Sequence, residues 1–332
     1  MTYVASLTAA AAAAARIRHL STSFSSSSSH SSQATELLLN AATSMPPVFS
    51  FNANDNHDNQ PVMSPLLPPK RIFLLRHGQA VHNPRAEVAR EAGCSFEEFL
   101  RLMQEDDAFD ADLTALGEEQ AKEAGSHNFV REALQSVDMI VSSPLSRAIR
   151  TADLVHDSHR NCKTGPKRVA IEHFREINGK LLNAKRRPRP VLETIFPHWN
   201  FSHVPHMDES WTEELEPHHE CSERGYRGLL WVMQQQEKNV LLVSHGGLLK
   251  LVMNDHPRVV LVDGRKQMQQ DKIRCVSERF GNCELRSFIM SVWTDKTSND
   301  GESHKNANGD KCLEQHLPIV TLEEISMNDD IE

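Results

Sequence analysis

Three short apolar segments in the middle of the chain have the pattern of buried strands. They run from Ile72 to Leu75, from Met139 to Val141 and from Asn239 to Val243, and polar residues follow each of them directly. Uninterrupted apolar runs of this length are typical of strands that are covered on both faces of a parallel sheet. Helix-like patterns alternate with these runs. The pattern therefore predicts an α/β fold, a mostly parallel central sheet with helices on both faces.

Apolar residues recur at helical spacing between the strand-like runs. They predict three helices, which cover Leu113 to Leu134, Arg147 to His156 and Glu223 to Gln236. Near the end of this region an alternating apolar segment from Cys283 to Val292 predicts an edge strand that closes the sheet.

Composition divides the chain into segments that do and do not pack. The predictions are a low-complexity leader at 1–50, a Pro-rich linker at 51–70, one folded domain at 71–293 with an insert at 180–219, and an acidic disordered tail at 294–332. The leader contains an alanine tract, Arg16, Arg18 and a serine-rich run, and its first acidic residue is Glu36. Such a segment is typical of a transit peptide for a mitochondrion or a plastid, or of a disordered leader without an address.

Charge and cysteine content narrow the function classes. The formal net charge is −9, so the chain lacks the basic excess typical of nucleic-acid binding. No apolar run has the ~20 residues that a membrane span needs, and we expect no membrane association. The six cysteines form no CxxC pair, which indicates reduced thiols in an intracellular compartment, cytoplasmic or organellar. The oligomeric state is not predicted.

Two of the strand-like runs end in a histidine followed by glycine. Arg76, His77 and Gly78 follow the first run, and Ser244, His245 and Gly246 follow the last. Ligands of open α/β sheets bind just outside the carboxyl ends of the strands. A neutral imidazole can attack phosphorus, and an arginine fork binds phosphoryl oxygens. A single histidine in such a place is usually a structural hydrogen-bonding group, but two in matched positions indicate a phosphoryl-transfer site.

Arg147 stands in the first turn of the helix predicted after the second run, in Ser-Ser-Pro-Leu-Ser-Arg-Ala. The N-terminus of a helix favours anions, because its free N–H groups and dipole point toward them. Arg147 is therefore a second candidate phosphate ligand. Arg150, one turn later, is interpreted as a surface residue.

Several blocks together resemble the histidine phosphatase (phosphoglycerate mutase-like) superfamily. They are Arg-His-Gly with Asn83 six residues after His77, the Leu-Thr-x-x-Gly-x-x-Gln-Ala block from Leu113, the Ser-Ser-Pro-Leu-Ser-Arg block, and the late Ser-His-Gly. The resemblance spans about Arg71 to Trp293. It implies His77 as the nucleophile that becomes phosphohistidine, with Arg76, Arg147, His245 and Asn83 binding the phosphoryl group. It implies no cofactor.

The resemblance also implies a carboxylate that acts as general acid and base. Glu176 matches the Arg-Glu position after the segment Val169 to Ile171 and is preferred to Glu172. The Asn-Cys-Glu-Leu-Arg-Ser segment from Asn282 is similar to plant-type members. Those relatives tend to have Cys-Asp-Lys-Arg after the glutamate, and Asn183-Ala-Lys-Arg-Arg stands here instead. Arg186 and Arg187 either contact a second anionic group of the substrate or belong to a solvated basic loop.

The insert is rich in histidine, but its spacings match neither a helical His pair nor a Cys-containing zinc site, so we expect no metal. The predicted function is a metal-independent phosphomonoester hydrolase acting on a small phosphorylated molecule or a phosphoprotein. The alternatives are a phosphoglycerate mutase-type isomerase and a non-catalytic phosphate-binding protein. Asn178-Gly-Lys and the basic run after Glu176 differ from the corresponding mutase segment, which favours hydrolysis.

Overall fold

A nine-stranded sheet forms the centre of the protein in a computed structural model that describes residues 64–157, 165–263, 277–294 and 318–325. Its strand order is β5-β4-β3-β6-β2-β8-β9-β7, and β1 pairs with β8. The strands are β1 (Ser64–Pro65), β2 (Lys70–Arg76), β3 (Met139–Ser142), β4 (Lys167–Ile171), β5 (Asn200–His203), β6 (Asn239–Ser244), β7 (Val259–Asp263), β8 (Leu285–Thr294) and β9 (Ile319–Glu324). From β5 to β2 all neighbours are parallel, whereas β8 runs antiparallel to both β2 and β9. The predicted mostly parallel sheet is confirmed.

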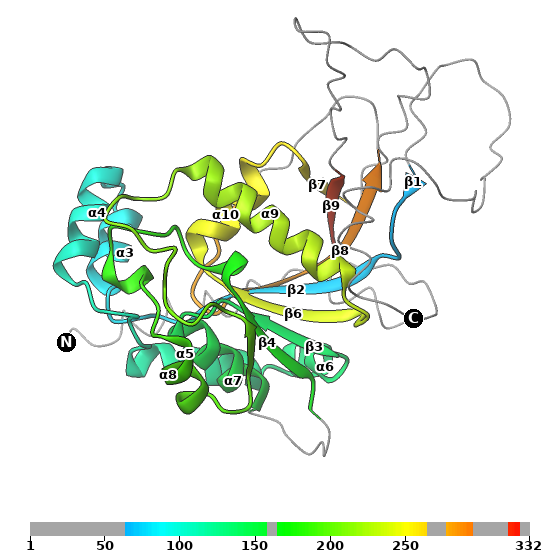
Figure 1. The fold of residues 1–332 in the computed structure, drawn as a ribbon, viewed down its shortest axis with the longest axis horizontal. Coiled ribbons are helices and arrows are strands. Elements are labelled where there is room, and N and C mark those ends of the chain that lie inside the picture. Colours follow the sequence, from blue (N-terminus) through cyan, green and yellow to red (C-terminus); the bar gives the residue numbers. More distant parts are fainter. Residues whose placement is uncertain (1–63, 158–164, 264–276, 295–317, 326–332) are drawn as a thin grey trace, which may run out of the picture.

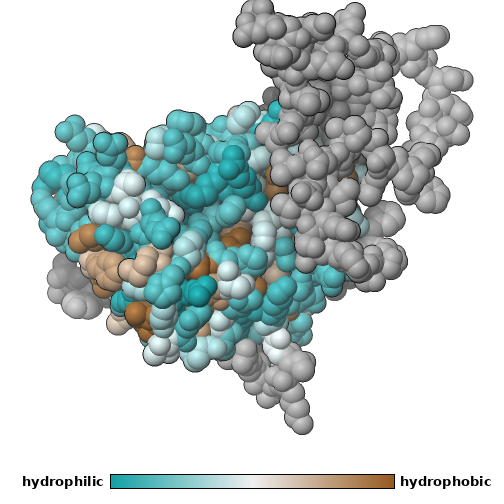
Figure 2. All heavy atoms as spheres, in the orientation of Figure 1, coloured by the Kyte–Doolittle hydropathy of each residue, from teal (hydrophilic) through white to brown (hydrophobic). Residues whose placement is uncertain are grey.

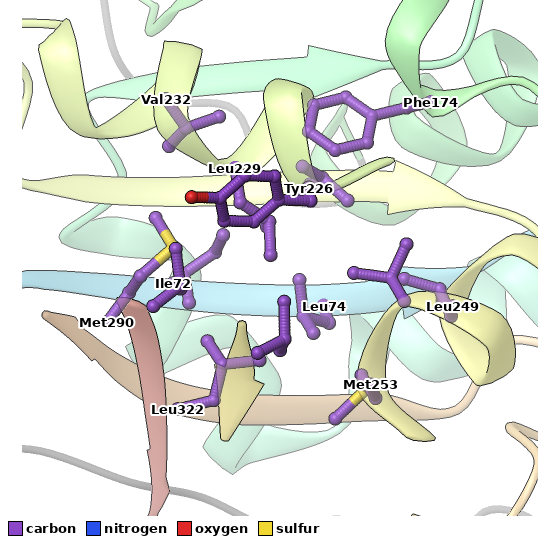
Figure 3. Close-up of a cluster of buried hydrophobic side chains, with 14 of the residues drawn as sticks. Ile72, Leu74, Phe174, Tyr226, Leu229, Val232, Leu249, Met253, Met290 and Leu322 are labelled. Carbon is purple, nitrogen blue, oxygen red and sulfur yellow. The ribbon is translucent and has the colours of Figure 1, made fainter. Parts of the chain in front are cut away.

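Alternate side chains of β2 enter two hydrophobic cores, one on each face of the sheet. Ile72 and Leu74 belong to one core, and Phe73 and Leu75 belong to the other. The first core, part of which is drawn in Figure 3, is covered by α9 (His218–Gln234) and α10 (Gly246–Asn254). The second is covered by α5 (Ala115–Ser126), α6 (Asn128–Gln135), α7 (Ser146–Asp157) and α8 (Arg189–Ile195). Figure 1 shows these groups on opposite sides of the strands.

Two further helices, α3 (Pro84–Glu91) and α4 (Phe96–Glu105), lie beyond the carboxyl end of β2 (Figure 1). Ala86, Leu102, Met103 and Leu181 give them a small core of their own. Short 3-10 turns, η1 (Glu172–Phe174) and η2 (Leu182–Ala184), shape the loop after β4. The face drawn in Figure 2 is mostly hydrophilic, with hydrophobic residues in small separate groups. Among the described residues no helix is long and apolar enough to cross a membrane.

The predicted helices at 147–156 and 223–236 are present as α7 and as the larger part of α9. The single helix predicted at 113–134 is wrong, because the segment forms α5 and α6 with a break at His127. His127 has extended backbone angles, φ −60° and ψ 132°, and ends one helix while it begins the next. Helical spacing of apolar residues continues across this break, so the pattern did not reveal it.

Two predictions about the end of the sheet are wrong. The segment predicted at 283–292 as an edge strand is β8, and it lies inside the sheet between β2 and β9. Residues 319–324, which fall in the predicted tail, form β9. This strand is short and its neighbours are acidic, so composition hid it, yet Val320 and Leu322 are fully buried. The leader at 1–50, residues 51–63 of the linker and residues 295–317 and 326–332 of the tail lie outside the described residues.

Candidate active site

The carboxyl ends of β2, β6 and β3 bring the predicted histidines together. The three strands are neighbours in the order β3-β6-β2, and the backbone N–H of His77 donates to the carbonyl of Ser244 at 3.0 Å. His77 and His245 then follow their strands side by side, with ring centroids 4.9 Å apart. Both residues are buried. The parallel register of two strands that each end in histidine therefore produces a histidine pair.

The contacts of His77 select the nitrogen that can react. Its Nδ1 lies 2.6 Å from the carbonyl oxygen of Gly78, which can only accept, so Nδ1 carries the proton and Nε2 keeps its lone pair. Burial lowers the pKa of His77 well below its ordinary value, and the positive charges of Arg147 and Arg76 lower it further. His77 is therefore neutral near pH 7, as a nitrogen nucleophile must be.

Arg147 contacts the reactive face of His77. It is the second residue of α7, and its Nε donates to His77 Nε2 at 3.3 Å while Nη1 donates to the carbonyl of Asn183 at 2.6 Å. The Asp110 carboxylate fixes the start of the helix, because it accepts from the backbone N–H and the hydroxyl of Ser146. Burial lowers the pKa of Arg147 to about 10. A fixed positive charge thus faces the lone pair that would attack phosphorus.

Arg76 is anchored at the end of its guanidinium. Nη1 donates to the carbonyl of Phe280 at 2.9 Å, and Nη2 donates to Glu87 at 2.8 Å. Its Nε is buried and has no hydrogen-bond partner among the described residues. Arg76 is thereby held rigidly while one N–H group remains available.

His245 is held by the loop after β3. Its Nε2 lies 2.8 Å from the hydroxyl of Ser143. Burial, followed by the charge of Arg147, lowers the pKa of His245 well below its ordinary value. His245 Nδ1 is buried and has no partner within the described part of the chain. If Ser143 donates to Nε2, the proton of the neutral ring lies on Nδ1, where it can meet a ligand oxygen.

Several buried nitrogen atoms around the histidine pair lack a hydrogen-bond partner within the described residues. Leaving a buried polar group unpaired costs about 1–3 kcal/mol, more when it is charged, so such groups are rare unless a ligand pairs with them. Among the unpaired buried nitrogens of the described residues, five belong to side chains around the histidine pair: Arg76 Nε, Arg147 Nη2, His245 Nδ1, His82 Nδ1 and Arg279 Nε. Three of these five groups belong to arginines, and the oxygens of one or more anionic groups would pair with them.

Glu176 lies beside this cluster at the N-terminus of α10. Its carboxylate accepts from the backbone N–H groups of Gly247 at 3.1 Å and Leu248 at 2.9 Å, and also from that of Ile177 at 3.0 Å. A Cβ added to Gly247 would lie 2.3 Å from Glu176 Oε1. The absence of a side chain at Gly247 therefore lets the carboxylate approach the helix end, and the backbone fixes its position.

The remaining predicted residues have different surroundings. Asn83 is buried at the start of α3, and its Oδ1 accepts from Ala80 N at 3.0 Å. Arg186 is buried against Glu172 and donates to the carbonyls of Pro205 and Met207. Arg187 is paired with Asp110 and Asp112. The contacts of Arg186 and Arg187 favour a structural role for both over contact with a second anion. Arg150 is half exposed and paired with Glu118, as expected of a surface residue.

Three residues of the site were not predicted from the sequence. His82 directly precedes Asn83 and is buried, and burial together with Arg147 and Arg76 lowers its pKa well below the ordinary value. Ser143 orients His245, and its place in the Ser-Ser-Pro turn was a usable signal. Arg279 lies 34 residues after His245 in a segment without a recognisable motif, so only the folded chain brings it near.

Gly78 lets two backbone segments pack against each other. A Cβ on Gly78 would lie 2.5 Å from the carbonyl oxygen of Gly117, and one on Gly117 would lie 2.0 Å from the carbonyl oxygen of Gln79. The loop after β2 and the first turn of α5 are therefore in backbone contact, which requires glycine on both sides. Among the described residues no group of three or more His, Cys, Asp or Glu side chains is arranged to hold a metal ion.

Comparison with known proteins identifies the family. The sequence profile of the histidine phosphatase superfamily (branch 1) matches residues 72–273. The chain belongs to this superfamily. It is 27% identical over 262 residues to a phosphoglycerate mutase-like protein of Arabidopsis thaliana, covering 70% of this chain and 89% of the relative. It is also 27% identical over 249 residues to phosphoglycerate mutase-like protein 1 of the same plant, covering 67% and 81%.

A solved structure is also similar to this chain. The ecdysone phosphate phosphatase from Bombix mori, crystallised with tungstate, aligns with a TM-score of 0.43 and 17% sequence identity, covering 66% of this chain and 88% of that one.

Proposed function

We propose that this protein is a phosphomonoester hydrolase that works through a phosphohistidine on His77. The observation that carries the proposal is the contact of Arg147 Nε with His77 Nε2, inside a cluster of buried nitrogens that lack partners among the described residues. A neutral imidazole lone pair lies beside the Arg147 guanidinium and the ring of His245, close to further unpaired N–H donors. That arrangement is suited to an entering phosphoryl group.

In the first step, His77 Nε2 attacks phosphorus, and the bond between phosphorus and the ester oxygen breaks. Arg76 Nε, Arg147 and His245 Nδ1 donate to the phosphoryl oxygens, and the amide nitrogen of Asn83 provides a further donor. Arg147 Nε transfers its hydrogen bond from His77 to the phosphoryl group as the nitrogen–phosphorus bond forms. Such preorganised donors stabilise the transition state because they need no reorientation.

Glu176 acts as the general acid in this step and as the general base in the next. As an acid it protonates the leaving oxygen. It then takes a proton from water, which attacks phosphorus and breaks the bond to Nε2, so that inorganic phosphate leaves and His77 is restored. The fixed position of the carboxylate, held by the N–H groups of Gly247 and Leu248, supports this role because proton transfer requires a donor within hydrogen-bonding reach.

The test is release of phosphate from phenyl phosphate by the full chain in the presence of chelator. We expect turnover that falls at least ~1000-fold in His77→Ala, because no other group replaces a covalent nucleophile. His206→Ala is the matched control, since His206 is exposed in the insert. Mass spectrometry of digests prepared without exposure to acid is expected to find phosphate on the peptide that contains His77.

Three outcomes would contradict the proposal. Activity that survives in His77→Ala excludes His77 as the nucleophile. Activity that disappears with chelator contradicts a metal-independent reaction. Interconversion of 2- and 3-phosphoglycerate without release of phosphate would instead identify a mutase.

A further inference from the structure

Arg279 extends the anion site of the proposed hydrolase toward solvent. A Cβ placed on Gly246 would lie 2.9 Å from Arg279 Nε, 3.3 Å from Arg279 Nη2 and 3.1 Å from Arg76 Nε. The Nε–Nη2 edge of Arg279 and the available N–H of Arg76 therefore face the same point of backbone, at the first residue of α10. This edge of a guanidinium is the one that binds a carboxylate or phosphate through two parallel hydrogen bonds.

The partners of Arg279 leave much of its binding capacity unused. Its Nη2 makes only a long contact of 3.5 Å with Glu87, its guanidinium lies 5.8 Å from the ring centroid of Phe99, and its Nε has no partner within the described residues. Glu87 already accepts a hydrogen bond from Arg76 and is paired with Arg90. Glu87 is thus shared by three guanidinium groups, and Arg279 has the longest of the three contacts.

Burial separates Arg279 from the arginines assigned to the phosphoryl group. Its side chain is 22% exposed, whereas Arg76 is 2% exposed and Arg147 is fully buried. A phosphoryl group bound by His77, Arg76 and Arg147 lies at the buried end of the site. The rest of the substrate must extend outward from it, and Arg279 lies on the outer side of the same cluster.

We infer that Arg279 binds an anionic group on the leaving part of the substrate, so that the preferred substrate is a phosphomonoester of an acidic alcohol. This inference rests on the proposed function and adds the substrate class to it. The phosphoryl group meets Arg76, Arg147 and His245, while a carboxylate or second phosphate on the alcohol meets the free edge of Arg279. A neutral alcohol would leave that edge unpaired.

The test compares two ligands that differ only in this group. Glycerol 3-phosphate carries a hydroxymethyl group where 3-phosphoglycerate carries a carboxylate. Their dissociation constants are measured by calorimetry on the full chain with His77→Ala, which prevents turnover. We expect 3-phosphoglycerate to bind at least ~10-fold more tightly, because a hydrogen bond between charged groups strengthens binding by about that factor. Adding Arg279→Gln is expected to raise the dissociation constant of 3-phosphoglycerate by that factor and to change that of glycerol 3-phosphate less than ~3-fold.

Arg227→Gln is the matched control, because Arg227 is 66% exposed and paired with Glu223 on α9. Equal affinity for the two ligands before Arg279 is changed would overturn the inference, and so would a preference that persists in Arg279→Gln. An equal loss for both ligands would also overturn it, because Arg279 would then contact the phosphoryl group itself. Failure of the proposed function is seen separately, as absence of phosphate release by the unsubstituted chain.

Discussion

At the residue scale, the Asp110 carboxylate positions Arg147, although it does not itself contact the reacting atoms. Asp110 is fully buried, adopts a positive φ of 43°, and accepts from Ser146 and from Arg187 Nη1. Ser146 directly precedes Arg147. Asp110 therefore fixes the backbone beside Arg147, and the hydrogen bond to the carbonyl of Asn183 fixes the guanidinium.

We expect Asp110→Asn to lower both the stability of the fold and its activity. The substitution removes the charge that Arg187 and Ser146 share and replaces one acceptor oxygen by an amide nitrogen, and the loss of a hydrogen bond to a charged group costs about 1.5–3 kcal/mol. It also loosens the start of α7, so kcat/KM for phenyl phosphate is expected to fall at least ~10-fold. Urea unfolding and steady-state kinetics measure the two effects.

Asp112→Asn is the matched control for Asp110→Asn. Asp112 pairs with the same arginine, but its side chain is 65% exposed, and exposed ion pairs contribute about 0–1 kcal/mol. Equal effects of the two substitutions would show that burial of Asp110 is not what positions Arg147.

Sequence reasoning located the residues of the site that follow strands and missed those that arrive by packing. His77, His245 and Arg147 each stand one or two residues from a strand end or a helix start, and local patterns predict such places. Arg279 and His82 have no such signal, because their positions depend on how α3, α4 and the segment before β8 pack together. Arg186 and Arg187 appeared available in the sequence because their partners Glu172 and Asp110 are distant along the chain.

At the element scale, β9 completes the antiparallel half of the sheet. It lies between β8 and β7 and buries Val320 and Leu322 in the core beneath α9. The hydroxyl of Tyr226 on α9 donates to the carbonyl of Pro318, directly before the strand. The acidic residues around 319–324 suggested a solvated tail. The strand itself has only two alternating buried side chains, and so short a pattern cannot be recognised in the sequence without its partner strands.

We expect a chain that ends at residue 317 to be strongly destabilised. Loss of β9 would expose the core that Val320 and Leu322 cover, and burying each of these side chains contributes about 1.5–3 kcal/mol. It would also remove the strand that joins β7 to β8. Urea unfolding is expected to show a loss of at least ~4 kcal/mol. A chain that ends at residue 326 retains β9 and is the control; a similar stability for both would contradict this role of the strand.

At the scale of the whole molecule, a chain with a net charge of −9 maintains a buried cationic site. Arg76, Arg147 and Arg279 gather at one end of the sheet, and burial lowers the pKa of Arg147 and Arg279 to about 10. Both arginines therefore stay charged near neutral pH. The pKa values of the three histidines among them are lowered too, and because the ordinary value is already near neutral pH, these histidines stay neutral. The overall charge gave no reason to expect a broad nucleic-acid-binding surface, and it gave no information about this local arrangement.

The same histidines are expected to make the fold less stable in mild acid. Their pKa values are held well below the ordinary value of about 6.5 by burial and by neighbouring arginines, so the unfolded chain takes up protons that the folded chain refuses. The free energy of unfolding is then unaffected by them above pH ~6.5 and falls as the pH drops below it, by up to about 1.4 kcal/mol per pH unit for each histidine. They are His77, His82 and His245.

Replacing one of these histidines should remove its share of the pH dependence. Between pH 7.5 and 5.0 each contributes a loss of about 2 kcal/mol by this linkage, so His82→Gln is expected to lose about 2 kcal/mol less than the unsubstituted chain. Urea unfolding at the two pH values measures the difference. His206→Gln is the control, because His206 is exposed and its ring meets water in both the folded and the unfolded chain. An unchanged pH dependence in His82→Gln would mean that His82 binds its proton in the folded protein as readily as in the unfolded chain, and that the arginines around it do not keep it neutral.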